Sequence, residues 1–388
     1  MAINLAVLLG LLLAINILLI SAYQAAHIWR AASTPASTAD RRAELPNYRE
    51  IDWAAVHFEE LRYASVEYHS FYGWRRKPFA GHTIAIDQMG IRPTPGAAPL
   101  ESPDPLVVFL GGSTMWGEGA DNHSTIPAHF VRQAGQPLRA HNLGESAFNA
   151  FQGYLFLRMH ILDGLRPDLV VSYDGINNVE GLCRAGNRPI GHGRELQIRE
   201  AMRGLDQRRV PDALTPRYLV LPIREFIAKL RQRSAAERED PYRLICSSDP
   251  QRARAVAKKL VDSWDTTMQL AESVGAQFIA VLQPSAYTGT PRTDHIDLNP
   301  TVKDEYDAVY GLVRELLADP RYLALSRRVL DMTNALDNAG YVYIDPQHLS
   351  PNGNEIIARH MLEADLFAAA FDTWATSTEM PLASTDNQ

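Results

Sequence analysis

The sequence predicts an α/β fold of three layers, in which a mainly parallel central sheet lies between two layers of helices. The first observation is an apolar run at 106–110 that ends in two glycines and Ser113, a pattern typical of a buried parallel strand. The second is the alternation of short apolar segments with helix-length segments further along the chain, which is typical of βαβ units. The third is that polar residues directly follow several of these strands.

The elements are assigned from apolar periodicity and from the glycines and prolines that bound each segment. The predicted strands are 106–110, 140–144, 169–173, 277–282 and 341–344, with a short strand or hairpin at 83–91. The predicted helices are 126–133, 150–162, 253–273, 303–317 and 352–364, and part of 46–76 is also expected to be helical.

These elements divide the chain into four parts. Residues 1–29 form a transmembrane anchor or signal segment, and 30–105 form a linker and an aromatic lead-in segment. The main domain spans 106–372, with a partly helical insertion or lid at 179–250, and a flexible tail follows at 373–388. We expect the aromatic residues of the lead-in segment to pack onto the main domain, although they could instead line a sugar-binding surface.

The amino terminus carries a nearly unbroken apolar run at 3–20. That length suits a single membrane-spanning helix. A cleaved signal peptide is the alternative, because small residues follow at 21–22 and 25–26. We expect an uncleaved anchor because the run is long for a signal peptide. The arginines after the run would favour a cytoplasmic position for the following segment, so the orientation of the anchor stays open.

Charge and cysteine content narrow the function classes. The net charge of −7 argues against a nucleic-acid partner, which would require a basic face. The two cysteines, Cys183 and Cys246, have no histidine at zinc-ligand spacing, so they predict no metal site. We also expect no cofactor. These cysteines are either small buried hydrophobes or, in an exported domain, one disulfide that closes a long loop, and we expect the disulfide.

The glycine-rich segment after 106–110 has four competing interpretations. A phosphate-binding P-loop requires a lysine after Gly117, and the chain has Glu118 there. A dinucleotide-binding fingerprint requires a third spaced glycine, which is missing after Gly119. The segment is then either a plain glycine turn with an incidental serine or a loop that presents a nucleophile at the carboxyl end of a strand.

Residues after the other predicted strands favour the nucleophile. Asp345 and His348 follow the last predicted strand. A serine hydroxyl needs a base within hydrogen-bond reach, and a carboxylate can orient the imidazole that serves as this base. We therefore predict Ser113, His348 and Asp345 as catalytic residues. The backbone N–H groups of Ser113 and Gly144 and the side-chain amide of Asn177 are predicted to form an oxyanion hole.

The order of these segments resembles the SGNH, or GDSL-like, hydrolase family over roughly residues 106–364 without the insertion. The matching segments are Gly111-Gly112-Ser113 with Gly117, Asn142-Leu143-Gly144, Gly175-Ile176-Asn177-Asn178 and Asp345-Pro346-Gln347-His348. Two positions depart from the family pattern, because Gly112 and Asn178 stand where the family usually has aspartates. Neither position carries the proton transfer, so we expect activity to be retained, with a different substrate fit.

The resemblance implies a three-layer sheet fold and ester chemistry. The leading hypothesis is a serine esterase that removes O-acyl groups, in particular O-acetyl groups, from a glycan or exopolysaccharide outside the bacterial inner membrane. The alternatives are an O-acetyltransferase that uses the same acyl-enzyme, and a non-catalytic, membrane-tethered component that binds glycan or belongs to a polysaccharide-biosynthesis machinery. The expected partners are an acylated carbohydrate and, through the amino-terminal helix, the membrane.

Overall fold

The computed structural model describes residues 40–208 and 240–378, together with scattered positions between residues 7 and 25. Of these, 40–195 and 244–378 belong to one compact unit, whereas 196–208 and 240–243 belong to a second. Within these ranges, no helix combines the length and the apolar character that crossing a membrane requires. The predicted anchor at 3–20 falls largely outside the described residues and stays a prediction.

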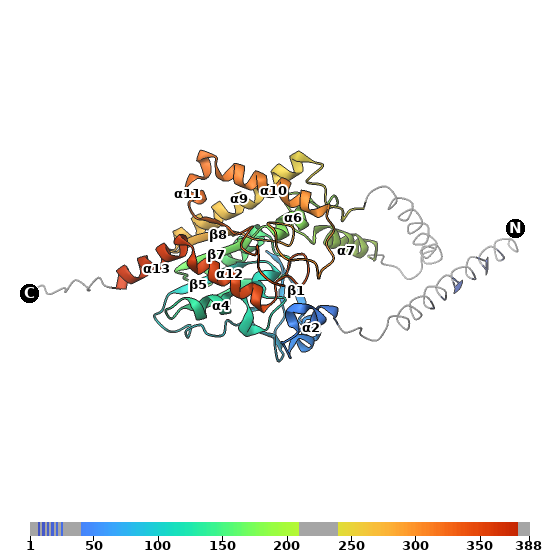
Figure 1. Cartoon of the computed structure of the whole chain (residues 1–388). Helices are drawn as coiled ribbons and strands as arrows, with labels where there is room; N and C mark the ends of the chain where they lie inside the picture. Colours follow the sequence, from blue (N-terminus) through green and yellow to red (C-terminus); the bar gives the residue numbers. More distant parts are fainter. Residues whose placement is uncertain are drawn as a thin grey trace, which may run out of the picture. The chain divides into compact units, whose positions relative to one another are not determined.

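A parallel sheet of five strands forms the centre of the larger unit (Figure 1). The strands are β5 (Leu106–Gly111), β6 (Arg139–Gly144), β7 (Leu169–Asp174), β8 (Gln277–Leu282) and β9 (Val329–Asp331), in the spatial order β6-β5-β7-β8-β9. The chain therefore leaves β5 toward one edge of the sheet and returns beyond β5 to continue toward the other edge. In an open α/β sheet, ligands bind outside the carboxyl ends of the strands at such a reversal.

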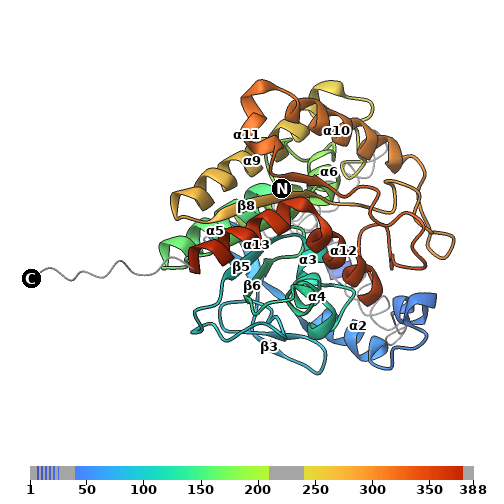
Figure 2. The same cartoon turned by 60° about the vertical axis from the view of Figure 1, so that its left-hand side comes forward.

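Helices cover both faces of this sheet, as the sequence predicts. Along β5, Val108 and Leu110 contribute to one apolar layer with α5 (Ala150–Leu162), α9 (Pro250–Ser273) and α10 (Val302–Leu317). Val107 and Phe109 contribute to the opposite layer with α4 (Ile126–Gln133), α12 (Pro351–Glu363) and α13 (Asp365–Thr378). Figures 1 and 2 show α9 and α10 on one side of the strands and α4 and α12 on the other. Because both of its faces are covered, β5 is apolar and buried along its whole length, whereas the edge strands β6 and β9 are only partly buried.

Local capping signals fix where two of the helices begin. The hydroxyl of Thr125 accepts a hydrogen bond from the N–H of Ala128 at the start of α4, and Pro127 lies in its first turn. Asn149 and Gln152 form a reciprocal capping box at the start of α5. Such caps satisfy the N–H groups that a helix leaves unpaired in its first turn, and the predicted bounds of both helices are correct.

One predicted strand is wrong. Residues 341–344 do not join the sheet, and the fifth strand is β9, which the sequence analysis missed. Val342, Tyr343 and Ile344 are almost completely buried, but they form one side of a tight loop in which Tyr343 pairs only with Leu349. The segment is apolar because it packs into the core, whereas β9 is a three-residue edge strand that is only partly buried and lacks an apolar run.

The segment before the sheet is folded against it. It contains α2 (Ala54–Tyr63) and two hairpins, β1 (Val66–His69) with β2 (Gly73–Arg76) and β3 (Phe79–Ala80) with β4 (Ala85–Ile86). Tyr48, Phe58 and Trp74 are buried, whereas Tyr63, Tyr68 and Phe71 are exposed. The described residues of the lead-in segment thus belong to the same unit as the sheet, and a subset of their aromatic rings faces solvent.

The region predicted as an insertion has well-defined ends. Helix α6 (Ile176–Leu182) occupies its first residues, helix α7 (Glu195–Arg208) follows, and α9 begins at Pro250. A disulfide joins Cys183 to Cys246 across a sequence separation of 63 residues. Residues 209–239 lie outside the described part of the chain.

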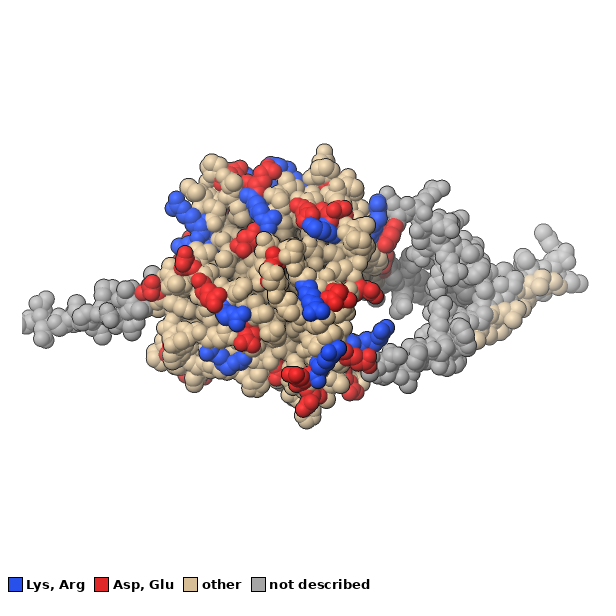
Figure 3. Space-filling view, viewed as in Figure 1, with Lys and Arg blue, Asp and Glu red and all other residues tan. Residues whose placement is uncertain are grey.

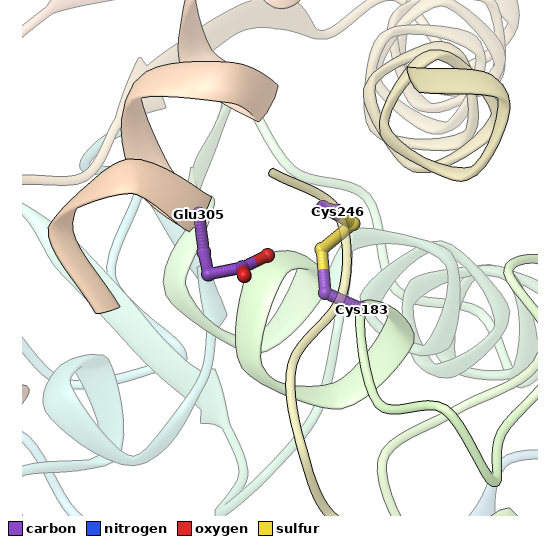
Figure 4. A group of neighbouring side chains, drawn as sticks. All are labelled: Cys183, Cys246 and Glu305. Carbon is purple, nitrogen blue, oxygen red and sulfur yellow. A yellow bond between two sulfur atoms is a disulfide. The ribbon is translucent and has the colours of Figure 1, made fainter. Parts of the chain in front are cut away.

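Among the described residues, the side chains of Cys183, Cys246 and Glu305 form the one group close enough to resemble a metal site (Figure 4). The two sulfur atoms are bonded to each other and are not free to bind a metal. The carboxylate of Glu305 accepts hydrogen bonds from the N–H and the hydroxyl of Ser247, at 2.9 and 2.6 Å. These hydrogen bonds tie the segment after Cys246 to α10.

The disulfide is expected to stabilise the fold by restricting the unfolded chain. A double variant, Cys183→Ala with Cys246→Ala, should lose about 2–4 kcal/mol of unfolding free energy in urea titrations. Reduced wild-type protein provides the matched control, because the chain has only these two cysteines. Thiol counting on denatured, unreduced protein should find no free thiol, and two free thiols would contradict the bridge.

Candidate active site

Ser113 lies just beyond the carboxyl end of β5. Strand β5 ends at Gly111, and Ser113 begins the four-residue helix α3 (Ser113–Trp116) after Gly112. Gly112 lies so close to the side-chain amide of Asn177 that a Cβ atom would collide with it. This close approach accounts for the glycine at a position where the resembled family usually has aspartate. The side chain of Asn177 fills that space.

His348 and Asp345 are presented by a tight loop. The N–H of Ile344 donates to the carbonyl of His348 at 2.9 Å, and the N–H of Ser350 donates to the carbonyl of Val342 at 2.8 Å. Within the loop, one carboxylate oxygen of Asp345 accepts the N–H groups of Gln347 and His348, each at 2.9 Å. The loop is thereby fixed by its own backbone, so the imidazole has a defined position.

The structure brings Ser113, His348 and Asp345 into one hydrogen-bonded chain. Nε2 of His348 lies 2.7 Å from Oγ of Ser113, although the two residues are 235 positions apart in the sequence. Nδ1 of the same ring lies 2.7 Å from Oδ2 of Asp345. These distances are within hydrogen-bond range for a nucleophile, its base and the carboxylate that orients the base.

The three predicted oxyanion donors differ in their surroundings. Ser113 is the first residue of α3, where the N–H groups of a helix have no partner within the helix. The side-chain amide of Asn177 donates to the carbonyl of Phe148 at 2.8 Å, and an amide nitrogen carries a second hydrogen. The N–H of Gly144 donates to Oδ1 of Asn142 at 3.0 Å. Gly144 therefore has a partner inside the protein, and the sequence analysis did not anticipate this hydrogen bond.

A second carboxylate, which the sequence analysis did not assign to the site, contacts the imidazole. Oε2 of Glu118 lies 3.2 Å from Nε2 of His348. Its carboxylate accepts hydrogen bonds from the hydroxyl of Ser146 and from Nη2 of Arg76, the latter at 3.1 Å. The N–H of Glu118 donates to the carbonyl of Ser113 at 3.0 Å. In the sequence, the only indication of this role is an acidic residue between Gly117 and Gly119. We call residues 112–120 the nucleophile loop.

Two arginines of the lead-in segment neutralise the carboxylates beside His348. Arg76 is almost completely buried and pairs with Glu118 and, at 3.4 Å, with Glu145. Nη1 of Arg42 lies 3.7 Å from Oδ2 of Asp345. No local pattern in the sequence predicts either contact, because each joins segments that are far apart in the chain.

The pKa values of the ring and its partners follow from these contacts. Burial alone would lower the pKa of His348, but the carboxylates of Asp345 and Glu118 outweigh it and raise this pKa to about 9. Burial opposes ionisation of Asp345 and Glu118, yet His348 and the hydrogen bonds to each carboxylate hold both pKa values below their ordinary range. For Glu145 burial prevails and raises the pKa to about 7.

Arg92 is completely buried and hydrogen-bonds to the backbone of the nucleophile loop. Its guanidinium donates to the carbonyls of Trp116, Gly117 and Ala120, at 3.1, 2.7 and 2.6 Å. The guanidinium groups of Arg92 and Arg76 both lie over the indole ring of Trp116, at 4.5 and 4.2 Å from its centroid. Cation–π contacts and charge-assisted hydrogen bonds together fix the loop that carries Ser113 and Glu118.

No family model matches the chain, and no curated protein matches it. Solved structures with some similarity include a member of the lipolytic protein G-D-S-L family from Veillonella parvula, with 10% identity, coverage of 67% of this chain and 97% of that one, and a TM-score of 0.36. A GDSL-like lipase from Bacteroides thetaiotaomicron has 15% identity, coverage of 66% and 87%, and a TM-score of 0.34. An acetyl xylan esterase has 16% identity, coverage of 67% and 99%, and a TM-score of 0.35. Similarities of this size assign no function, which has to follow from the geometry of the site.

Replacing Arg92 should destabilise the protein through the nucleophile loop. The Arg92→Met variant leaves several buried carbonyls without donors, and we expect it to lose about 3 kcal/mol or more of unfolding free energy in urea titrations. Arg75→Met is the matched control, because Arg75 is partly exposed and pairs with Glu67 at 2.9 Å. Such a pair contributes less than about 1 kcal/mol. Equal losses in the two variants would contradict the assigned role of Arg92.

Proposed function

We propose that the protein is a serine esterase that cleaves acyl esters through an acyl-enzyme on Ser113. The observation that carries the proposal is the hydrogen-bonded chain from Ser113 through His348 to Asp345, with 2.7 Å at each contact. Its location at the carboxyl end of β5, beside the reversal of strand order, supports the same conclusion.

Each side chain has one role in this chemistry. Neutral His348 accepts the proton of Ser113 at Nε2 as Oγ attacks the ester carbonyl, and it returns that proton to the leaving alcohol. Asp345 holds the other ring nitrogen and stabilises the imidazolium that forms. A water molecule then attacks the acyl-enzyme with the same proton transfers, which releases the acid and restores the serine.

The tetrahedral intermediates require donors for their oxyanion. The N–H of Ser113 and the second amide hydrogen of Asn177 are the two candidates that their surroundings favour. Gly144 supports the site through its hydrogen bond to Asn142 and through its close approach to the backbone of Met115 and Trp116, which leaves no room for a Cβ atom. Oxyanion donors of this kind each contribute about a hundredfold or more to the rate.

We propose an O-acetylated glycan or exopolysaccharide as the substrate. The family resemblance of the four sequence segments favours ester chemistry on carbohydrate, and exposed aromatic rings at Tyr63, Tyr68 and Phe71 can stack on sugar faces. On the face in Figure 3, acidic and basic side chains are interspersed. A net charge of −7 likewise offers nothing that would attract a nucleic acid.

We also propose that the catalytic unit lies outside the cytoplasm, tethered to the bacterial inner membrane by the apolar run at 3–20. Disulfides persist in oxidising compartments, so the bridge between Cys183 and Cys246 supports this location. Association with a polysaccharide-biosynthesis machinery would be consistent with such a position. The location can be tested by blocking free thiols in intact cells, isolating the protein and counting the blocked cysteines. A protein in which both cysteines are blocked would argue against this location.

Removing the nucleophile should abolish ester hydrolysis. We expect Ser113→Ala to lower kcat for an activated acetyl ester on the order of a thousandfold or more, and His348→Ala to lower it similarly. The double variant should be no slower than either single variant, because the two groups act as a unit. If wild-type protein and Ser113→Ala hydrolyse the ester equally slowly, a non-catalytic glycan-binding role becomes the better interpretation.

The acyl acceptor distinguishes a hydrolase from an acetyltransferase, since both share the acyl-enzyme. We expect acetate release to account for all of the ester consumed, with or without an added oligosaccharide, because the proposed esterase passes the acyl group to water. The measurement compares free acetate with acetyl groups on the oligosaccharide, with Ser113→Ala as the blank. Acetyl groups transferred in proportion to oligosaccharide concentration would indicate the transferase instead.

A further inference from the structure

The Nε2 atom of His348 faces two groups at once. Oγ of Ser113 lies 2.7 Å away and Oε2 of Glu118 lies 3.2 Å away. The role of base requires Nε2 to carry a lone pair toward Ser113, because the serine must donate its proton there. The carboxylate of Glu118 contacts the same atom. Because an ionised carboxylate stabilises a proton on Nε2, the charge of Glu118 influences whether the lone pair is available.

The surroundings of Glu118 favour its ionised form. Arg76 and Ser146 both donate hydrogen bonds to its carboxylate. An ionised carboxylate has only acceptor atoms, so its contact with Nε2 is attractive only when Nε2 carries a hydrogen. Nδ1 of the ring also faces a carboxylate, that of Asp345, at 2.7 Å. Carboxylate oxygens therefore lie within reach of both ring nitrogens, an arrangement that favours the imidazolium over the neutral ring.

We propose that Glu118 is a positioning residue that holds His348 in its protonated form in the free enzyme, so that Ser113 becomes nucleophilic only after the proton on Nε2 has left. The two carboxylates favour the protonated ring whatever reaction the site performs. The consequence for Ser113 rests on the proposed esterase function.

The charged groups around His348 come from several elements. Asp345 belongs to the same loop, Glu118 to the nucleophile loop, and Glu180 to α6. In the lead-in segment, Arg42 pairs with Asp345 and Arg76 pairs with Glu118. The carboxylates of Asp345 and Glu118 contact the ring directly, whereas the arginines pair with those carboxylates, so the net effect on the ring favours its positive charge.

The proton balance defines the catalytic consequence. While Nε2 carries a proton, that single N–H is shared between Oε2 of Glu118 and Oγ of Ser113, and the ring cannot accept the serine proton. Once that proton has passed to solvent, the neutral ring takes the serine proton as the bond from Oγ to the acyl carbon forms, and gives it to the leaving oxygen as the ester bond breaks. The imidazolium formed in between is stabilised by both Asp345 and Glu118.

Glu118→Gln tests this in the full-length protein, because it keeps the shape of the side chain and removes its charge. We expect the ascending limb of kcat/KM against pH, measured with an activated acetyl ester, to lie near pH 9 in wild type and to move down by about one pH unit or more in the variant. Activity at pH 7 should then rise by about tenfold or more, whereas a merely structural role predicts a fall at every pH.

A readout independent of turnover separates this inference from the proposed function. Histidine ring NMR shifts in Ser113→Ala protein give the pKa of His348 directly, with His348→Gln used for assignment. We expect this pKa to fall by about one unit or more when Glu118→Gln is added. An unchanged value would overturn the inference even in an active esterase, and a fall in an inactive protein would leave the inference standing while the esterase proposal failed.

Two further variants serve as controls. Glu145→Gln removes a buried carboxylate that pairs with the same Arg76 but not with His348, so it should leave the titration of His348 within about 0.3 unit of wild type. Glu118→Asp keeps the charge and withdraws it from the ring, so it should give an intermediate pKa. If Glu145→Gln lowered the pKa as much as Glu118→Gln, the effect would belong to Arg76 and the proposal would be wrong.

Discussion

The contact between His348 and Ser113 depends on the geometry of the parallel sheet. Ser113 can reach the imidazole only because β5 ends at the sheet edge and turns at once into α3. The loop that carries His348 lies at the same edge, where Oγ1 of Thr114 donates to the carbonyl of Gln347 at 3.1 Å. Since both loops are fixed by their own hydrogen bonds and to each other, the hydroxyl and the ring are positioned before any substrate binds, which is what efficient acyl transfer requires.

The lead-in segment supplies the counter-charges for this site. Carboxylates on either side of an imidazole would repel each other and resist burial, unless cations offset them. Arg42 and Arg76 provide those cations, and Arg92 fixes the loop between them through Trp116. The lead-in segment, which we expected to pack onto the main domain, thus also contributes charged groups to the site, and removing it would leave Asp345 and Glu118 without their arginine partners.

The sequence analysis placed Asp345 and His348 after a strand at 341–344, and although that strand is absent from the sheet, both residues meet Ser113. Residues 341–344 are apolar because Val342 and Tyr343 are buried, and burial alone does not distinguish a strand from a loop packed into the core. The sequence analysis missed strand β9 because this edge strand has three residues, is only partly buried and lacks the apolar run that predicts a strand. Asp345 and His348 still lie near the carboxyl end of β5, because the loop that carries them contacts Ser113 and Thr114 there.

The sequence by itself determined the alternation of strands and helices, four of the five strands of the sheet, and the segments that carry Ser113, Asp345 and His348. These features depend on local patterns of apolar residues, caps and glycines, which a single sequence contains. Only the tertiary structure decided that Glu118 contacts Nε2 of His348 and that Arg76 pairs with Glu118. Such contacts join segments separated by tens to hundreds of residues, and no local periodicity or spacing encodes which charged side chains will meet when the layers pack.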